Sequence, residues 1–149
     1  LHAYIIDDEP KAVDMIEMLL RLHVPEVGKI SWATSASQGV EAISREAPDL
    51  LFLDIEMPHL DGFRVLELLE EVPLQVVFTT AYDHFAIRAI RFSALDYLLK
   101  PVQADELRAA RKLVEHLGPA AEQIGMRAKA SRGEAALRAS AGRTRDSSA

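Results

Sequence analysis

The chain contains no cysteine, which excludes a disulfide framework and any metal site built on thiolates. It also has no apolar run near the roughly 20 residues that span a bilayer. Acidic residues appear as early as Asp7, which is not typical of a secretory signal. We therefore expect a cytoplasmic protein with no membrane partner.

Aromatic residues are scarce, at 6%, yet 49% of the 149 residues are hydrophobic. This length and composition suit one well-buried domain and are too small for two of average size. The net charge is −6, which does not favour nucleic acid binding by the chain as a whole. We expect a folded domain over residues 1–118 and a basic tail or linker over 119–149, rich in Ala, Arg and Ser and either disordered or partly helical.

Four short apolar runs each end on a polar residue. Continuous apolar runs of this kind predict strands that are buried on both faces, in a parallel sheet covered by helices. Ligands of such sheets bind at the carboxyl ends of the strands, so the polar endings should converge on one edge. The runs are residues 3–6, 50–53, 76–79 and 97–99, and their endings are Asp7-Asp8, Asp54, Thr80 and Lys100.

Helical periodicity separates these runs and predicts the remaining elements. Alternating strands and helices predict an α/β fold, a doubly wound, flavodoxin-like parallel sheet of five strands in the order 2-1-3-4-5 with five helices. The predicted helices begin at Pro10, at a cap on Ser37, at residue 63, at Tyr82 and at Ala104. One further strand covers residues 30–34, and the strand that contains the run 97–99 covers residues 95–99.

In this topology Asp7, Asp8 and Asp54 meet beside the point where the strand order reverses. Three carboxylates within about 5 Å repel by roughly 3 kcal/mol per pair, which a divalent cation relieves. Mg²⁺, or Mn²⁺ in its place, prefers such hard oxygen ligands. We predict Asp8 and Asp54 as direct ligands, Asp7 as a ligand directly or through water, and the Glu56 carbonyl as a further one.

The same edge suits phosphoryl transfer, which needs positioning and charge neutralisation above all. Asp54 would attack as the phosphoacceptor, and the Lys100 ammonium would hold the phosphoryl group. The Thr80 hydroxyl could hydrogen-bond a phosphoryl oxygen only once that group is present, which would make it a sensor.

Each residue taken alone also has a purely structural interpretation. Asp7 and Asp8 suit a helix start, Asp54 a turn and Thr80 a strand, while Lys100 would be a surface charge. Tyr97 is equally open to interpretation as a buried strand aromatic. The functional interpretation depends on the joint occurrence of these residues at four strand ends.

Several motifs together resemble the receiver domain of two-component response regulators over residues 1–118. The stretch 78–101 further resembles receivers of LytTR-type (LytR/AlgR-like) transcription regulators. The motifs are Asp7-Asp8-Glu9-Pro10, Leu53-Asp54-Ile55-Glu56-Met57-Pro58, Leu60-Asp61-Gly62, Thr79-Thr80-Ala81-Tyr82-Asp83 and Ala94-Leu95-Asp96-Tyr97-Leu98-Leu99-Lys100-Pro101.

This resemblance implies a sensor histidine kinase as phosphodonor to Asp54, with magnesium as cofactor. If the domain is such a switch, we predict a homodimer in the phosphorylated state. The resemblance also implies that Thr80, with the adjacent Ala81, binds the phosphoryl group and reorients together with Tyr97. The face formed by residues 82–92, 95–99 and 104–117 would then signal onward. The resemblance further implies a cis peptide at Lys100-Pro101 and a role for Glu56 and Tyr82 in tuning the lifetime of the phosphorylated form.

LytTR-type regulators continue into a DNA-binding domain of about a hundred residues, and residues 119–149 are too few for one. We therefore expect DNA contact only through an output domain absent from this chain, which is either a stand-alone receiver or part of a longer regulator. Two other functions stay open: an aspartate-nucleophile phosphohydrolase, and a constitutive interaction domain. A receiver would not be an enzyme beyond its own phosphorylation and dephosphorylation.

Overall fold

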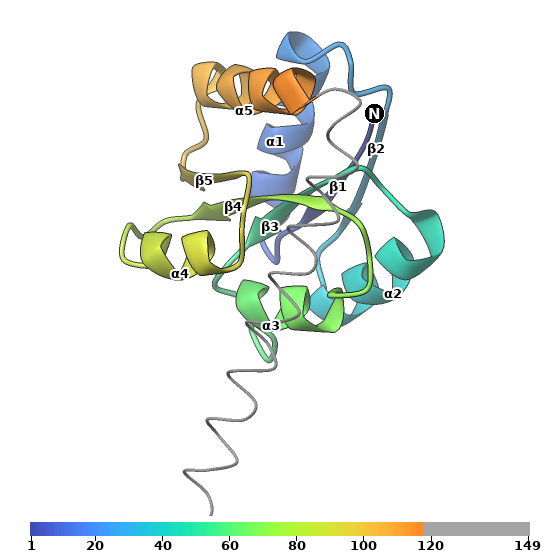
Figure 1. The fold of residues 1–149 in the computed structure, drawn as a ribbon, viewed down its shortest axis with the longest axis vertical. Coiled ribbons are helices and arrows are strands. Elements are labelled where there is room, and N and C mark those ends of the chain that lie inside the picture. Colours follow the sequence, from blue (N-terminus) through green and yellow to red (C-terminus); the bar gives the residue numbers. More distant parts are fainter. Residues whose placement is uncertain (118–149) are drawn as a thin grey trace, which may run out of the picture.

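The chain folds into one five-stranded parallel sheet with the strand order β2-β1-β3-β4-β5 in this computed structural model (Figure 1). The structure describes residues 1–117, so the expected tail 119–149 lies outside the described residues. The predicted fold class is confirmed. The strands are β1 (His2–Ile6), β2 (Lys29–Ala33), β3 (Leu50–Asp54), β4 (Gln75–Thr80) and β5 (Asp96–Leu99), and the helices are α1 (Pro10–His23), α2 (Ala36–Glu46), α3 (Gly62–Leu68), α4 (Ala86–Arg91) and α5 (Ala104–Leu117).

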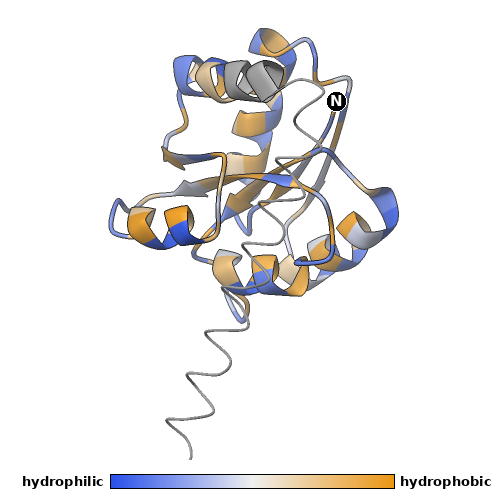
Figure 2. Cartoon of the chain, viewed as in Figure 1, coloured by the Kyte–Doolittle hydropathy of each residue, from blue (hydrophilic) through white to orange (hydrophobic). Residues whose placement is uncertain are grey.

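Helices cover both faces of the sheet, which explains why its central strands are mostly apolar before their polar carboxyl ends. Helices α1 and α5 lie on one face, and α2, α3 and α4 lie on the other (Figure 1). Strand β3 is buried along its whole length, and the side chains of β1 divide between two hydrophobic clusters, one on each face. Figure 2 shows that the helices are amphipathic, with hydrophobic and hydrophilic residues on the same helix. No helix among the described residues is both long and apolar enough to cross a bilayer.

Two predicted helix starts are wrong, and hydrogen bonds explain both. Helix α2 begins at Ala36 because Ser35, rather than Ser37, is its cap; the Ser35 hydroxyl accepts from the Gln38 amide at 3.4 Å. Helix α4 begins only at Ala86, whereas Tyr82 was expected to start it. The Tyr82 carbonyl accepts the Tyr97 hydroxyl instead of an amide of a following helical turn.

Gly62 lets helix α3 start directly against the end of β3. A Cβ atom at this position would lie 2.6 Å from the Asp54 carbonyl oxygen and 3.0 Å from the Ile55 Cα, both backbone atoms. The Gly62 amide donates to the Ile55 carbonyl at 2.8 Å, which fixes this close approach. The loop between β3 and α3 therefore depends on a residue without a side chain.

We expect Gly62→Ala to lower the free energy of unfolding by about 2 kcal/mol, because backbone must move to admit the methyl group. Denaturant unfolding in the absence of metal measures this. Gly28→Ala is the matched control, since a Cβ there would meet nothing within 4 Å. Equal effects of the two substitutions would contradict this account of the loop.

Candidate functional site

The four polar strand endings lie together at the carboxyl edge of the sheet. Asp7 and Asp8 directly follow β1, and Asp54 is the last residue of β3. Thr80 is the last residue of β4, and Lys100 directly follows β5. The parallel register places these ends side by side, because β3 pairs with both β1 and β4, and β4 pairs with β5. The sheet thus brings the predicted site residues to one edge.

Asp7, Asp8 and Asp54 form a cluster in which one carboxylate oxygen of each lies within 4.8 Å of the others. Asp7 is fully buried and Asp54 is 3% exposed. Asp7 and Asp8 precede the N-cap of helix α1, which is Glu9, and the Glu9 side chain makes no capping hydrogen bond. Asp7 Oδ1 instead accepts from the Glu9 amide at 3.0 Å, which orients its carboxylate within the cluster.

Lys100 supplies the positive charge of this site. Its Nζ lies 2.9 Å from Asp7 Oδ2 and 3.5 Å from Asp54 Oδ2. Burial by itself would lower the pKa of Lys100, but the contact with Asp7 and the charge of Asp54 raise it above its ordinary value. The lysine is therefore held as an ammonium between two carboxylates.

The pKa of Asp54 is raised to about 8, first by burial and then by the neighbouring charge of Asp7. Lys100 opposes this rise, whereas Asp8 adds to it. One ammonium therefore does not balance three carboxylates, and the cluster retains a strong preference for further positive charge.

This raised pKa predicts that the metal-free protein loses stability as pH rises from about 4 to about 8. Between these values the unfolded chain releases the Asp54 proton while the folded chain keeps it, so raising the pH favours unfolding. Below about 4 both states are protonated, so the stability is greatest there and no longer changes with pH through this group. Denaturant unfolding in chelator across this range, for the wild type and Asp54→Asn, measures the effect. The free energy of unfolding of Asp54→Asn should increase relative to that of the wild type as the pH rises to about 8. Parallel pH profiles of the two proteins would contradict this prediction.

The donor set fits a divalent cation with hard oxygen ligands. Asp8 Oδ1 is buried and has no hydrogen-bond partner among the described residues, an arrangement that is costly unless a cation or water satisfies the oxygen. Carboxylate oxygens are the ligands that Mg²⁺ prefers, whereas a softer metal would favour nitrogen or sulfur. The predicted further ligand, the carbonyl of Glu56, belongs to the loop that follows β3.

Thr80 and Tyr97 are connected through the peptide groups of Tyr82. The Thr80 hydroxyl accepts from the Tyr82 amide at 3.2 Å, and the Tyr97 hydroxyl donates to the Tyr82 carbonyl. Thr80 is buried, and burial is the first cause of the raised pKa of the partly buried Tyr97. A change in the Thr80 hydrogen bond would therefore move the Tyr82 backbone, which also binds the Tyr97 hydroxyl.

The other predicted residues lie around this edge. Glu56, Ala81 and Tyr82 are exposed, and the Lys100–Pro101 peptide bond is cis. The Lys100 amide donates to the Thr80 carbonyl at 2.7 Å, which ties β5 to the end of β4 beside the cluster.

Sequence reasoning missed two features near the site. Asp61 caps helix α3 by accepting a hydrogen bond from the Arg64 amide at 2.9 Å. Its position directly before Gly62, where the helix begins, could have indicated this cap in the sequence. A cavity of about 400 Å³ also adjoins the loop after Asp54. The Arg88 guanidinium lies in its wall, 4.4 Å from the centre of the Phe63 ring, and nothing in the local sequence indicates this pairing.

Comparison with known proteins shows the family to which this chain belongs. Residues 3–112 match the response regulator receiver domain. The chain is 41% identical over 127 residues to an uncharacterised response regulatory protein of Vibrio vulnificus, covering 85% of this chain and 51% of that protein. It is 35% identical to the sensory transduction protein LytT of Enterococcus faecalis over 123 residues, covering 80% and 50%. The chain thus spans about half the length of the curated relatives it matches.

The fold is likewise that of solved receivers. The REC domain of AraT, a response regulator from Geobacillus stearothermophilus, matches with a TM-score of 0.69 and 30% identity, over 78% of this chain and 94% of that one. Fold and site together define a doubly wound α/β protein with an acidic cluster and a lysine at the carboxyl edge of its sheet. The chain belongs to the response regulator receiver domain family of two-component systems, and its relatives include LytTR-type regulators.

Proposed function

We propose that this domain is a phosphorylation-activated switch that accepts a phosphoryl group from a sensor histidine kinase on Asp54. The observation that carries the proposal is the placement of the Asp54 carboxylate, 3.5 Å from Lys100 Nζ and within 4.8 Å of Asp7 and Asp8. An Asp54 oxygen attacks the phosphorus and forms a P–O bond while the P–N bond to the donor imidazole breaks. The electron pair of that bond leaves with the imidazole, which takes up a proton if it departs as the neutral ring.

Asp7, Asp8 and Asp54 would hold Mg²⁺ or Mn²⁺, with the Glu56 carbonyl as a further ligand. When bound, the metal supplies positive charge opposite the negative charge of the transferring group. The protein's own residues account for the rest of the site. Asp7 positions Lys100 through their 2.9 Å contact, and the Lys100 ammonium can then turn toward a phosphoryl oxygen on Asp54.

The switch begins at Thr80. Its hydroxyl would leave the Tyr82 amide, at present 3.2 Å away, and donate to a phosphoryl oxygen, assisted by the amide of Ala81. Because Tyr82 also holds the Tyr97 hydroxyl, the two side chains would reorient together. Glu56 and Tyr82 stand exposed at the rim and would tune how long the phosphorylated form lasts.

The response would reach partners through the face made by α4, β5 and α5. Ile87, Ile90 and Leu99 are exposed apolar side chains on the first two of these elements, and they would favour a homodimer once Tyr97 has moved. Receivers of this family are not generally classed as enzymes. A transcriptional output and DNA contact would belong to a separate output domain, with 1–118 as the receiver and 119–149 as a tail or linker.

The test is intact-mass analysis after incubation with a small acyl phosphate, with Mg²⁺ or with a chelator. One added phosphoryl mass that requires the metal is the expected result. Steady release of inorganic phosphate from a generic phosphoester would indicate a phosphohydrolase instead. A folded protein that neither gains mass nor releases phosphate would indicate a constitutive interaction domain.

A further inference from the structure

A second cavity, of about 330 Å³, lies between strand β2 and helix α2. It is separate from the carboxylate cluster, since none of its lining residues belongs to that cluster. Its volume is at the lower end of the range for small-molecule sites, so its occupant would be small. The lining residues used below are Tyr4, Trp32, Glu41, Ala42, Arg45 and Glu46.

Tyr4 gives this cavity a polar group that has no protein partner in the described part of the chain. The side chain is only 3% exposed, and its hydroxyl makes no hydrogen bond to another residue in the described part of the chain. Burial raises the pKa of Tyr4 first, the charge of Glu46 raises it further, and Arg45 lowers it. The hydroxyl therefore lies near Arg45 and Glu46 in the cavity wall, where a ligand atom could become its hydrogen-bond partner.

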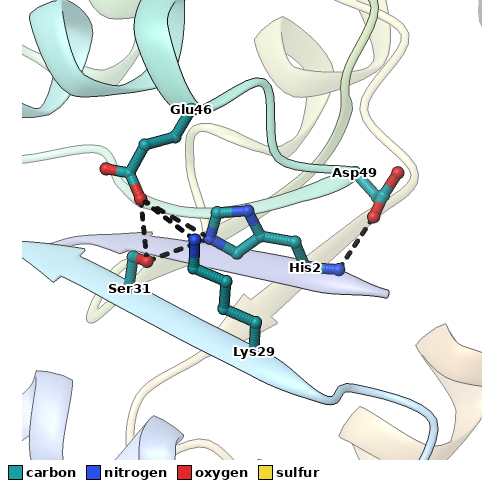
Figure 3. Close-up of polar contacts among 5 residues, drawn as sticks. All are labelled: His2, Lys29, Ser31, Glu46 and Asp49. Atoms are coloured by element: carbon teal, nitrogen blue, oxygen red, sulfur yellow. Dashed lines mark hydrogen bonds and ion pairs between the residues drawn. The ribbon is translucent and has the colours of Figure 1, made fainter.

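Glu46 is already engaged by neighbouring side chains through one of its two oxygens, so we assign the ligand contacts to other residues. Its Oε1 accepts from the Ser31 hydroxyl at 3.1 Å and lies 3.9 Å from both Lys29 Nζ and His2 Nε2 (Figure 3). The Ser31 hydroxyl also contacts His2 Nε2 at 2.9 Å, and the His2 amide donates to Asp49 Oδ2 at 2.8 Å. Figure 3 shows the contacts from Ser31, Lys29 and His2 gathered on one oxygen of Glu46, with Asp49 bound separately to the His2 amide.

Glu41 and Arg45 are the cavity's two uncommitted charges. They stand four residues apart on α2, a spacing that commonly gives an ion pair. Both are exposed and line the cavity, yet among the described residues neither makes an ion pair or a side-chain hydrogen bond. The cavity thus offers one free cation, one free anion and a phenol, with Ala42 and Trp32 as apolar walls.

We propose that this cavity binds a small zwitterion of the free amino acid type. The ligand carboxylate pairs with Arg45 and accepts from the Tyr4 hydroxyl, and the ligand ammonium pairs with Glu41. A carboxylate held by an arginine and a phenol gives the Tyr4 hydroxyl an acceptor and uses the planar donor geometry of the guanidinium. The proposal concerns binding only and is independent of the phosphorylation proposed for Asp54.

The test uses L-leucine as the probe, with its deaminated analogue 4-methylpentanoate and its decarboxylated analogue isoamylamine. Amide NMR spectra report on α2, and the indole N–H of Trp32 gives a unique signal because the chain has a single tryptophan. We expect saturable shifts of Trp32 and α2 signals with half-saturation near 1 mM. Each analogue should bind at least about tenfold more weakly, because each leaves one charge of the cavity unpaired.

Three variants of the full chain locate the contacts, and each should weaken leucine binding about tenfold or more. They are Tyr4→Phe, Arg45→Gln and Glu41→Gln. Arg91→Gln is the matched control, since Arg91 is an exposed basic residue on α4, away from β2, and should bind as the wild type does. Absence of saturable shifts in the folded wild type, or equal binding of either analogue or of all variants, would overturn the proposal.

Discussion

Asp54→Asn should abolish the phosphoryl adduct that the wild type forms with an acyl phosphate and Mg²⁺. The amide is nearly the same size as the carboxylate, so packing at a residue that is only 3% exposed is preserved. The amide lacks the anionic oxygen that attacks phosphorus. Among the described side chains, only Asp7 and Asp54 lie within ion-pair distance of Lys100. Intact-mass analysis should show no added mass in the variant at times when the wild type is largely modified.

Asp49→Asn is the matched control for this experiment. Asp49 precedes the opposite end of β3, where its Oδ2 accepts from the His2 amide at 2.8 Å, and an asparagine oxygen can accept the same bond. This variant should be phosphorylated as the wild type is. An equal adduct in Asp54→Asn would place the phosphoacceptor elsewhere, and peptide mapping of that adduct would identify it.

The fold was predictable because its signals are local and redundant. Each central strand is an unbroken apolar run, since helices cover both of its faces, and such runs fix both the element type and the parallel arrangement. The position of a polar residue at a strand end then fixes its place at the carboxyl edge. Asp54 and Thr80 needed no further information than this to be placed at the same edge as Asp7.

What the sequence left unpredicted depends on contacts between distant residues. The start of α4 is set by the Tyr97 hydroxyl, which takes the Tyr82 carbonyl from fifteen residues away. Lys100 Nζ lies closer to Asp7 Oδ2 than to Asp54 Oδ2, at 2.9 Å against 3.5 Å. This difference depends on how side chains from the ends of three different strands are oriented. The cavity beside Tyr4 likewise arises only when α2 packs along β2. No local pattern encodes these relations.

Lys100→Met should slow phosphorylation of Asp54 by at least about 100-fold, because a preorganised cation aimed at developing charge has an effect of that order. Methionine keeps most of the length and apolar volume of the lysine stem but supplies no donor or charge. The substitution also removes the charge of Lys100, which is the one influence that lowers the pKa of Asp54. The Asp54 pKa in the metal-free variant should therefore rise above about 8. The time course of the mass adduct measures the rate, and carboxyl NMR titration in chelator measures the pKa.

Mg²⁺ affinity separates this role of Lys100 from a general loss of structure. The ammonium competes with a metal ion for Asp7 and Asp54, so Lys100→Met should bind Mg²⁺ at least as tightly as the wild type while it is phosphorylated far more slowly. Lys11→Met is the matched control, because Lys11 is exposed at the start of α1 and makes no ion pair among the described residues. A Lys100 variant that binds Mg²⁺ and gains the phosphoryl group at the wild-type rate would show that Lys100 serves only to hold Asp7 in the folded domain.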